Sequence, residues 1–157
     1  MKRTASAITF SEQELSQARM LKDRLVAAVR DYFRSAGKKN AVVGLSGGVD
    51  SAAVCGLLAE ALGPKNVFAY HLPVDNDKRD GKDAELVAEK FKVNFETVKL
   101  RPLVDSACRL FGAKDKVARG NLSARTRMAA LPNCEIFRSR STAMKRRGQL
   151  DELDPTN

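Results

Sequence analysis

Long apolar runs are missing from this sequence of 157 residues. No stretch has the length that a helix needs to cross a bilayer, and the opening residues, MKRTASAITF, lack the apolar core of a secretory signal. We therefore expect no membrane association and a cytoplasmic location. Aromatic residues make up only 6% of the chain, which leaves little material for stacking on nucleic-acid bases.

Cysteine is also scarce. The three cysteines, Cys55, Cys108 and Cys134, are odd in number, lie far apart and include no CxxC pair. This pattern predicts neither a disulfide framework nor a zinc site. We expect buried or incidental thiols, with Cys55 packing on the inner side of a helix.

The charge balance is strongly basic, with a formal net charge of +9. Such a surface suits polyanions, from nucleotides to nucleic acid. The basic residues are scattered, however, and cluster only at Lys38-Lys39 and Lys145-Arg146-Arg147. The pattern favours a solvated surface over a dedicated groove, so nucleic acid is not expected as a partner.

Helical and strand patterns alternate along the chain. A capping-box signature, Ser11 with Glu14, opens a helical pattern that stops at Gly37. Helices are also predicted over 51–63, 81–92, 101–112 and 120–131, the last capped by Asn121, and strands over 41–45, 66–72 and 94–100. This order predicts right-handed βαβ units, and hence a three-layer α/β sandwich with a parallel sheet covered on both faces.

The segment GLSGGVDS (44–51) follows the first predicted strand, at the edge of the sheet where ligands bind. Gly47 and Gly48 let the backbone approach an anion closely. Ser46 and Ser51 add hydroxyl groups, and the next helix adds amide donors and the positive end of its dipole. Together these groups predict a phosphate cradle.

Asp50 is an unexpected neighbour for an anion unless a divalent cation bridges the two, as Mg²⁺ does between carboxylates and phosphates. The segment is neither a Walker A loop nor the GxGxxG dinucleotide fingerprint. An ordinary turn between strand and helix needs one glycine and a cap. It does not account for two glycines, two serines and an acid together.

SGGxDS after a buried strand resembles the signature of the PP-loop ATP pyrophosphatases, which cleave ATP between its α and β phosphates. A second stretch, GNLSARTRM (120–128), resembles the GNxxARxRM helix of NAD synthetases, and ALGPKNVFAYHLP and LRPLVDSACRLFG are also similar to that family. The resemblance covers roughly Leu21 to Leu131. It implies an adenine nucleotide α-hydrolase-like fold.

The resemblance also implies a reaction. In NAD synthetases the carboxylate of deamido-NAD attacks the α-phosphorus of ATP and pyrophosphate leaves; ammonia then displaces AMP to form the amide of NAD. ATP and Mg²⁺ are the implied cofactors, and deamido-NAD and ammonia the implied substrates. Ammonia is the expected nitrogen donor because no glutaminase domain precedes the loop. The family also implies a homodimer with the deamido-NAD site at the subunit interface.

Site residues follow from the same resemblance. The implied ATP contacts are Gly44, Leu45, Ser46, Gly47, Gly48, Val49, Asp50 and Ser51. Among them Ser46, Asp50 and Ser51 are the expected catalytic residues, and Asp50 also holds Mg²⁺. Arg125 matches the arginine that contacts deamido-NAD, although Arg125 and Arg127 also fit a solvated helix face. His71 lies near the expected adenine position, or is a hydrogen-bonded residue at a strand end.

After Leu131 the sequence departs from the family. A GT(G/D)xxxE-type segment and a TKYGDG-like stretch are expected, but PNCEIFRSRS and a polar stretch follow instead. We expect an incomplete domain over 1–131, cut after about three strands, and an irregular basic and polar tail over 132–157 with a short helix within Thr142–Leu153. A shifted reading frame or a truncated gene would explain the change.

Three functions are compatible with this reading. The first is an ammonia-dependent NAD synthetase whose activity is weak or lost through truncation. The second is a non-catalytic remnant that binds nucleotide or dimerises. The third is another PP-loop enzyme, such as a tRNA-thiolation enzyme, against which GNLSARTRM argues.

Overall fold

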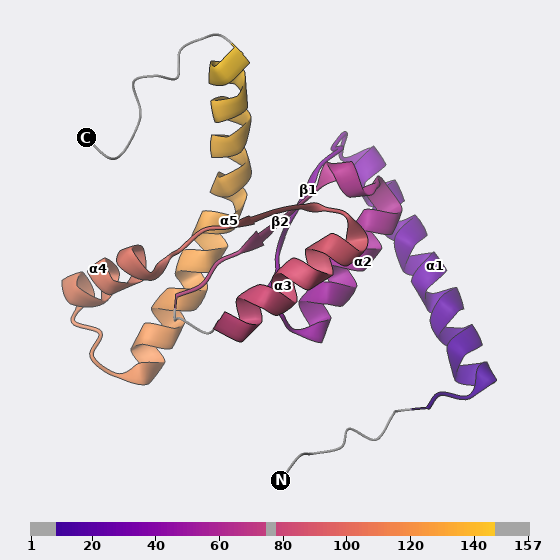
Figure 1. Ribbon diagram of the computed structural model, residues 1–157, viewed down its shortest axis with the longest axis horizontal. Coiled ribbons are helices and arrows are strands. Elements are labelled where there is room, and N and C mark those ends of the chain that lie inside the picture. The colour runs from indigo at the N-terminus through magenta and orange to yellow at the C-terminus, as the bar shows by residue number, and fades with distance from the viewer. Residues whose placement is uncertain (1–8, 75–77, 147–157) are drawn as a thin grey trace.

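The computed structural model describes residues 9–74 and 78–146 (Figure 1). Its elements in chain order are α1 (Glu12–Ser35), β1 (Ala41–Gly44), α2 (Val49–Leu62), the short 3₁₀ helix η1 (Pro64–Asn66), β2 (Val67–His71), α3 (Lys78–Phe91), β3 (Asn94–Thr97), α4 (Arg101–Phe111) and α5 (Lys116–Arg146). The three predicted strands and five predicted helices are therefore confirmed, with shifted ends.

The sheet has three parallel strands in the order β1-β2-β3. Ala41 pairs with Val67 between β1 and β2, and Phe68 pairs with Asn94 between β2 and β3. Parallel neighbours need a crossover, which α2 and α3 supply. All three strands therefore end at one edge of the sheet, and the predicted parallel α/β fold is confirmed.

Two apolar clusters lie on opposite faces of the sheet. One joins β1 and β2 to α2 and α3, through Val43, Leu45, Cys55, Val67, Ala69, Ala84 and Ala88. The other centres on Tyr70, Leu72, Val74, Leu100 and Val104 and extends to α4 and α5. Helices thus cover both faces, as a three-layer sandwich requires. Cys55 is buried in the first cluster, and this burial raises the pKa of its thiol.

The helix ends agree with the sequence in one case and differ in another. At α1, the Glu14 amide donates to Ser11 Oγ at 3.2 Å and the Ser11 amide donates to Glu14 Oε2 at 2.8 Å, so the predicted capping box is confirmed. At α5, the predicted cap Asn121 is wrong. The helix starts earlier, and Asp115 Oδ1 accepts a bond from the Ala118 amide at 2.8 Å.

Helix α1 lies along one margin of the molecule and packs on α2 (Figure 1). Val26 is its one buried residue, and Arg30 Nε donates to the Ala61 carbonyl near the end of α2 at 3.2 Å. A cation there suits the negative end of the α2 dipole. Little of the apolar surface of α1 is buried, because Leu21 and Leu25 remain 57% and 43% exposed.

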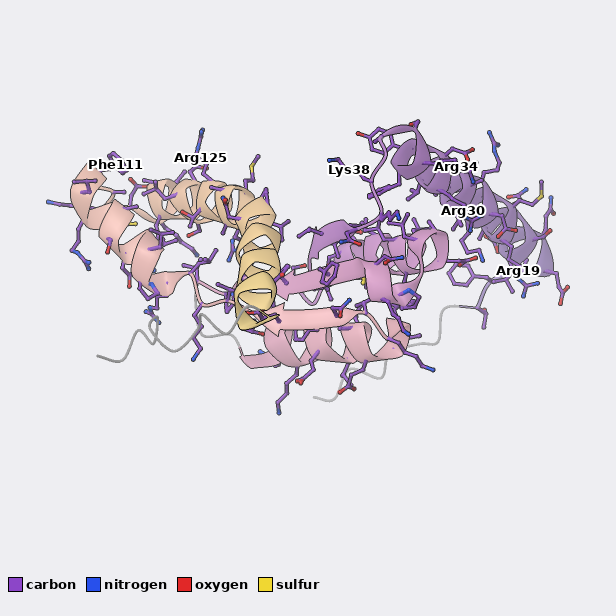
Figure 2. The ribbon with its side chains drawn as sticks, turned by 90° about the horizontal axis from the view of Figure 1, so that it is seen from above. Arg19, Arg30, Arg34, Lys38, Phe111 and Arg125 are labelled. Carbon is purple, nitrogen blue, oxygen red and sulfur yellow. The ribbon has the colours of Figure 1, made fainter. Side chains whose placement is uncertain are left out.

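Helix α5 continues well past the position where the sequence predicts an irregular tail. It runs to Arg146 with Pro132 inside it, so the predicted irregular tail is wrong for residues 132–141, while residues 142–146 are helical within the range of the predicted short helix. Apolar periodicity reports burial, whereas an exposed helix needs only residues with adequate helix propensity. Pro132 has no amide to donate to the Met128 carbonyl, and Figure 2 shows α5 bending along its length. Residues 147–157, with part of the predicted Thr142–Leu153 helix, lie outside the described residues.

A search of the described residues finds no helix with the length and apolar character of a membrane span.

Candidate functional site

The predicted phosphate cradle lies at the edge of the sheet where β1 ends and α2 begins. Leu45, the first residue after β1, is held in three ways. Its side chain is 2% exposed, its amide donates to the Tyr70 carbonyl at 2.9 Å, and its carbonyl lies 3.0 Å from His71 Nδ1. The residue that begins the loop is therefore held in place by its burial and by its contacts with β2.

The two serines of the loop lie together. Ser46 Oγ and Ser51 Oγ are 3.1 Å apart, and Ser51 Oγ donates to the Gly48 carbonyl at 2.9 Å. The amides of Ser46 and Gly48 point at hydroxyl oxygens 3.3 Å away, on Ser51 and Ser46 respectively. These bonds link the loop to the first turn of α2, so an anion that binds here meets a preformed backbone.

The glycines are required for different reasons. Gly47 has a φ of +84°, a region that favours glycine. A Cβ on Gly47 would also lie 2.7 Å from the backbone carbonyl oxygen of Asp80, at the start of α3. Gly48 is the N-cap of α2 and brings no capping side chain. The first amides of α2 thus face a loop of small residues, an arrangement that suits an anion.

Val49 and Asp50 occupy the exposed first turn of α2. Among the described residues, no group of three or more His, Cys, Asp or Glu side chains forms a metal-binding cluster. A cation at Asp50 would therefore draw most of its oxygen ligands from the bound molecule and from water. One open carboxylate beside an anion cradle fits the way Mg²⁺ is held together with a phosphate.

A cavity of about 600 Å³ opens beside the loop. Its lining includes Ser46 of the loop, His71 at the end of β2, Asp80 of α3, and Arg127, Met128 and Leu131 of α5. The loop and the cavity together form a continuous site along the carboxyl edge of the sheet. A volume of this size accommodates a small organic ligand.

Sequence reasoning chose one arginine of α5, and the structure brings another to the cavity. Arg127 lines the cavity, and its Nε donates to the Leu72 carbonyl just after β2 at 2.9 Å. Arg125 is exposed and points away from the rest of the molecule in Figure 2. Two residues along a helix are turned by about 200° from each other, so the two arginines face opposite sides.

Asp80 was not among the predicted site residues. The sequence offers one signal for its position. Gly81 follows it, and a small residue at a helix start allows another group to approach closely. In the structure the His71 ring lies next to this position, with Nε2 at an ordinary contact distance of 3.5 Å from the Cβ that Gly81 lacks.

A parallel α/β sheet with this serine and glycine loop at its carboxyl edge, leading into an open helix N-terminus, defines a domain with the adenine nucleotide α-hydrolase-like fold. The comparisons specify it further. The family model described as NAD synthase matches residues 21–136, most of the chain. The chain belongs to the NAD synthase family.

Individual relatives agree with this assignment. The NH(3)-dependent NAD(+) synthetase of Trichlorobacter lovleyi is 42% identical over 114 residues, which are 72% of this chain and 42% of that protein. The corresponding protein of Pyrococcus horikoshii is 36% identical over 110 residues, 69% of this chain and 42% of its own. The chain thus spans about two fifths of the length of these relatives. They do not favour the tRNA-thiolation alternative.

Solved structures show the same fold. The NH3-dependent NAD synthetase of Campylobacter jejuni superposes with a TM-score of 0.71 at 25% identity, covering 76% of this chain and 52% of that chain. The glutamine-dependent NAD+ synthetase of Acinetobacter baumannii gives a TM-score of 0.70 at 28% identity, covering 85% of this chain and 25% of that chain.

Proposed function

We propose that the chain carries the ATP-binding part of an ammonia-dependent NAD synthetase. The carboxylate of deamido-NAD attacks the α-phosphorus of ATP, the α–β phosphoanhydride bond breaks and pyrophosphate leaves. Ammonia then attacks the acyl adenylate, loses a proton and displaces AMP, which gives the amide of NAD. The observation that carries the proposal is the cradle at 44–51, which opens beside a ligand-sized cavity.

The cradle's task in this reaction is to hold the departing pyrophosphate. Backbone amides of the first turn of α2 are the proposed donors to the anion, and the Ser46 and Ser51 hydroxyls, which accept the Ser46 and Gly48 amides, lie beside them. Preformed donors lower the barrier because they need no rearrangement as negative charge builds on the leaving group. Mg²⁺ held by Asp50 would neutralise part of that charge.

The cavity beside the loop is the proposed place of the adenosine. Its floor includes buried Tyr70 and half-buried Leu131, which offer apolar surface to a base. Arg127 supplies a positive charge at the same cavity, held in place by its bond to the Leu72 carbonyl. A guanidinium there suits a phosphate or a ring nitrogen of the nucleotide.

Deamido-NAD is proposed to reach Arg125 from outside the cavity, because Arg125 faces away from it. A cytoplasmic homodimer would allow this, with the substrate lying between subunits. Leu110 and Phe111, 79% and 71% exposed, supply apolar surface near the same end of the molecule (Figure 2). Burial of such residues is a usual source of stability for a dimer.

The test is a direct assay of the full chain with deamido-NAD, ATP, Mg²⁺ and an ammonium salt. We expect AMP, pyrophosphate and NAD in equal amounts, all three dependent on deamido-NAD and on ammonia. If the chain binds Mg-ATP but forms no AMP, it is a nucleotide-binding module and not an enzyme. Absence of Mg-ATP binding would contradict both.

A further inference from the structure

His71 is the only histidine of the chain, and the proposed reaction gives it no role. It is 7% exposed at the end of β2, and its Nδ1 lies 3.0 Å from the Leu45 carbonyl oxygen. A carbonyl oxygen can only accept a hydrogen bond, so Nδ1 carries the proton in this contact. The imidazole therefore donates to the residue that immediately precedes Ser46.

The backbone of His71 is itself fixed. Its carbonyl accepts a bond from the Val98 amide, just after β3, at 2.9 Å. On the other side, Tyr70 accepts the Leu45 amide at 2.9 Å. The imidazole thus extends from β2, the central strand, toward β1. It lies just beyond the last paired residues of these two strands, Gly44 and Tyr70.

The other edge of the imidazole packs on α3. Nε2 lies 3.5 Å from the position that a Cβ on Gly81 would occupy, an ordinary van der Waals distance, so the ring lies beside the first turn of α3. The preceding residue, Asp80, is the one whose backbone closes on Gly47. His71 therefore touches both supports of the loop: its starting residue, Leu45, and the first turn of α3.

We propose that His71 is a positioning residue for the phosphate cradle, an inference that deepens the proposed function and rests on it. By donating to the Leu45 carbonyl, the imidazole keeps that carbonyl turned toward β2. The Ser46 amide, which belongs to the same peptide unit as the Leu45 carbonyl, then keeps its bond to Ser51 Oγ at 3.3 Å and holds the loop in shape. Without the donor, a buried acceptor loses its partner and the carbonyl gains from turning toward water or the loop, where it repels phosphate.

Three substitutions distinguish the loss of the hydrogen-bond donor from the loss of the packing that the ring provides. In His71→Asn, the amide nitrogen occupies nearly the place of Nδ1 and still donates to Leu45. In His71→Gln, the amide nitrogen falls nearer Nε2, and His71→Leu fills the space with no donor. Pyrophosphate binding with Mg²⁺ is measured by calorimetry on the full chain, and urea unfolding is measured in parallel.

We expect His71→Asn to bind pyrophosphate within about threefold of the wild type, and His71→Gln and His71→Leu to bind it about tenfold or more weakly, the size of one lost buried hydrogen bond. Asn is smaller than Gln, so a loss of packing alone would weaken binding at least as much in His71→Asn as in His71→Gln, whereas loss of the donor gives the opposite order. Equal binding by His71→Leu and the wild type would overturn the inference, and so would equal loss in Asn and Gln. If His71→Leu fails to fold, the Asn and Gln pair carries the test.

A second readout uses the single imidazole. Nitrogen-15 shifts of the wild type should show the Nδ1–H tautomer, and these signals should move when pyrophosphate is added. An Nε2–H tautomer would overturn the inference without reference to any variant. Failure of the wild type to bind pyrophosphate or Mg-ATP would contradict the proposed function itself, whereas wild-type binding that His71→Leu retains contradicts only the role of His71.

Discussion

The backbone carbonyl oxygen of Asp80 lies 2.7 Å from the point where Gly47 would carry a Cβ. The two residues come from different βαβ units: Gly47 follows β1, and Asp80 lies in the first turn of α3. Their contact shows that α3 closes one side of the loop at 44–51, the proposed phosphate cradle. It also shows that glycine at 47 serves the close approach of another segment as well as the turn itself.

Gly47→Ala should therefore remove pyrophosphate binding. The substitution places alanine at φ +84°, which costs about 1–2 kcal/mol, and forces the Asp80 backbone away from the loop. We expect binding to weaken by more than about tenfold, the equivalent of 1.4 kcal/mol. Calorimetry with pyrophosphate and Mg²⁺ measures it.

Gly37→Ala is the matched control. Gly37 also has a positive φ, +63°, but no described atom lies within 4 Å of its missing Cβ. It should lose a similar amount of stability, about 1–2 kcal/mol, while keeping wild-type pyrophosphate binding. Equal binding in both variants would show that the contact between Gly47 and Asp80 does not shape the cradle.

Asp50→Asn tests the metal role. The side chain is exposed in the first turn of α2, so its neutralisation should lower the free energy of unfolding by at most about 1 kcal/mol through the helix dipole. The increase in pyrophosphate or ATP affinity that Mg²⁺ produces in the wild type should disappear, and any AMP formation should stop. Glu12→Gln makes the same charge change in the first turn of α1. It should leave the effect of Mg²⁺ on affinity and any AMP formation unchanged. A full Mg²⁺ effect in Asp50→Asn would exclude the ligand role assigned to it.

Gly56→Ala tests how α2 and α3 pack. A Cβ on Gly56 would lie 2.7 Å from Cζ of the half-buried Phe91, so alanine should lose about 1–3 kcal/mol to the clash, of which the gain in helix propensity offsets about 0.5–1 kcal/mol. Gly120→Ala, at a helical position with nothing described within 4 Å, should instead stabilise by about 0.5–1 kcal/mol. Urea unfolding measures both. The destabilisation caused by Gly56→Ala should be smaller in a protein that also carries Phe91→Leu. An equal destabilisation in both would contradict the contact between Gly56 and Phe91 as its cause.

The ion pair between α4 and α5 predicts a dependence of stability on pH. Arg119 Nη1 lies 2.7 Å from Asp105 Oδ1, and this hydrogen bond, helped by Arg101, lowers the pKa of Asp105 below its usual 3.8. A carboxyl group whose pKa is lower in the folded state stabilises the fold when the pH is above its pKa in the unfolded state. This stability is lost as the pH falls through the pKa of the folded state. The gap in unfolding free energy between the wild type and Asp105→Asn should thus be full above about pH 5 and shrink below pH 3.8. A gap that stays constant from pH 7 to pH 3, or one that high salt leaves unchanged, would show that the pair contributes nothing.

Features encoded by neighbouring residues were predictable. The cradle is such a feature, because a strand, a run of glycines and serines and a helix follow one another in the sequence. The parallel order of the strands followed from their alternation with helices. Both required only local patterns and the rule that ligands bind at the carboxyl edge.

Features made by distant residues were not predictable. The bond between His71 and Leu45 spans 26 positions, and the one between Arg127 and Leu72 spans 55. Helical periodicity alone separates the faces of Arg125 and Arg127 but does not say which face meets the sheet. The course of α5 beyond Pro132 was missed for a related reason, since its continuation depends on propensity and not on a buried stripe.

The account depends most on the cradle binding an anion through its backbone. The direct measurement is a titration of the nitrogen-15-labelled chain with pyrophosphate, with and without Mg²⁺. The ionic strength is kept constant so that the screening of non-specific attraction to a protein of net charge +9 does not change during the titration. The largest amide shift changes should fall on Ser46 through Ser51 and vanish in Gly47→Ala. Largest changes elsewhere, on the basic surface of α1 for example, or no saturable change at all, would contradict the assignment of this loop.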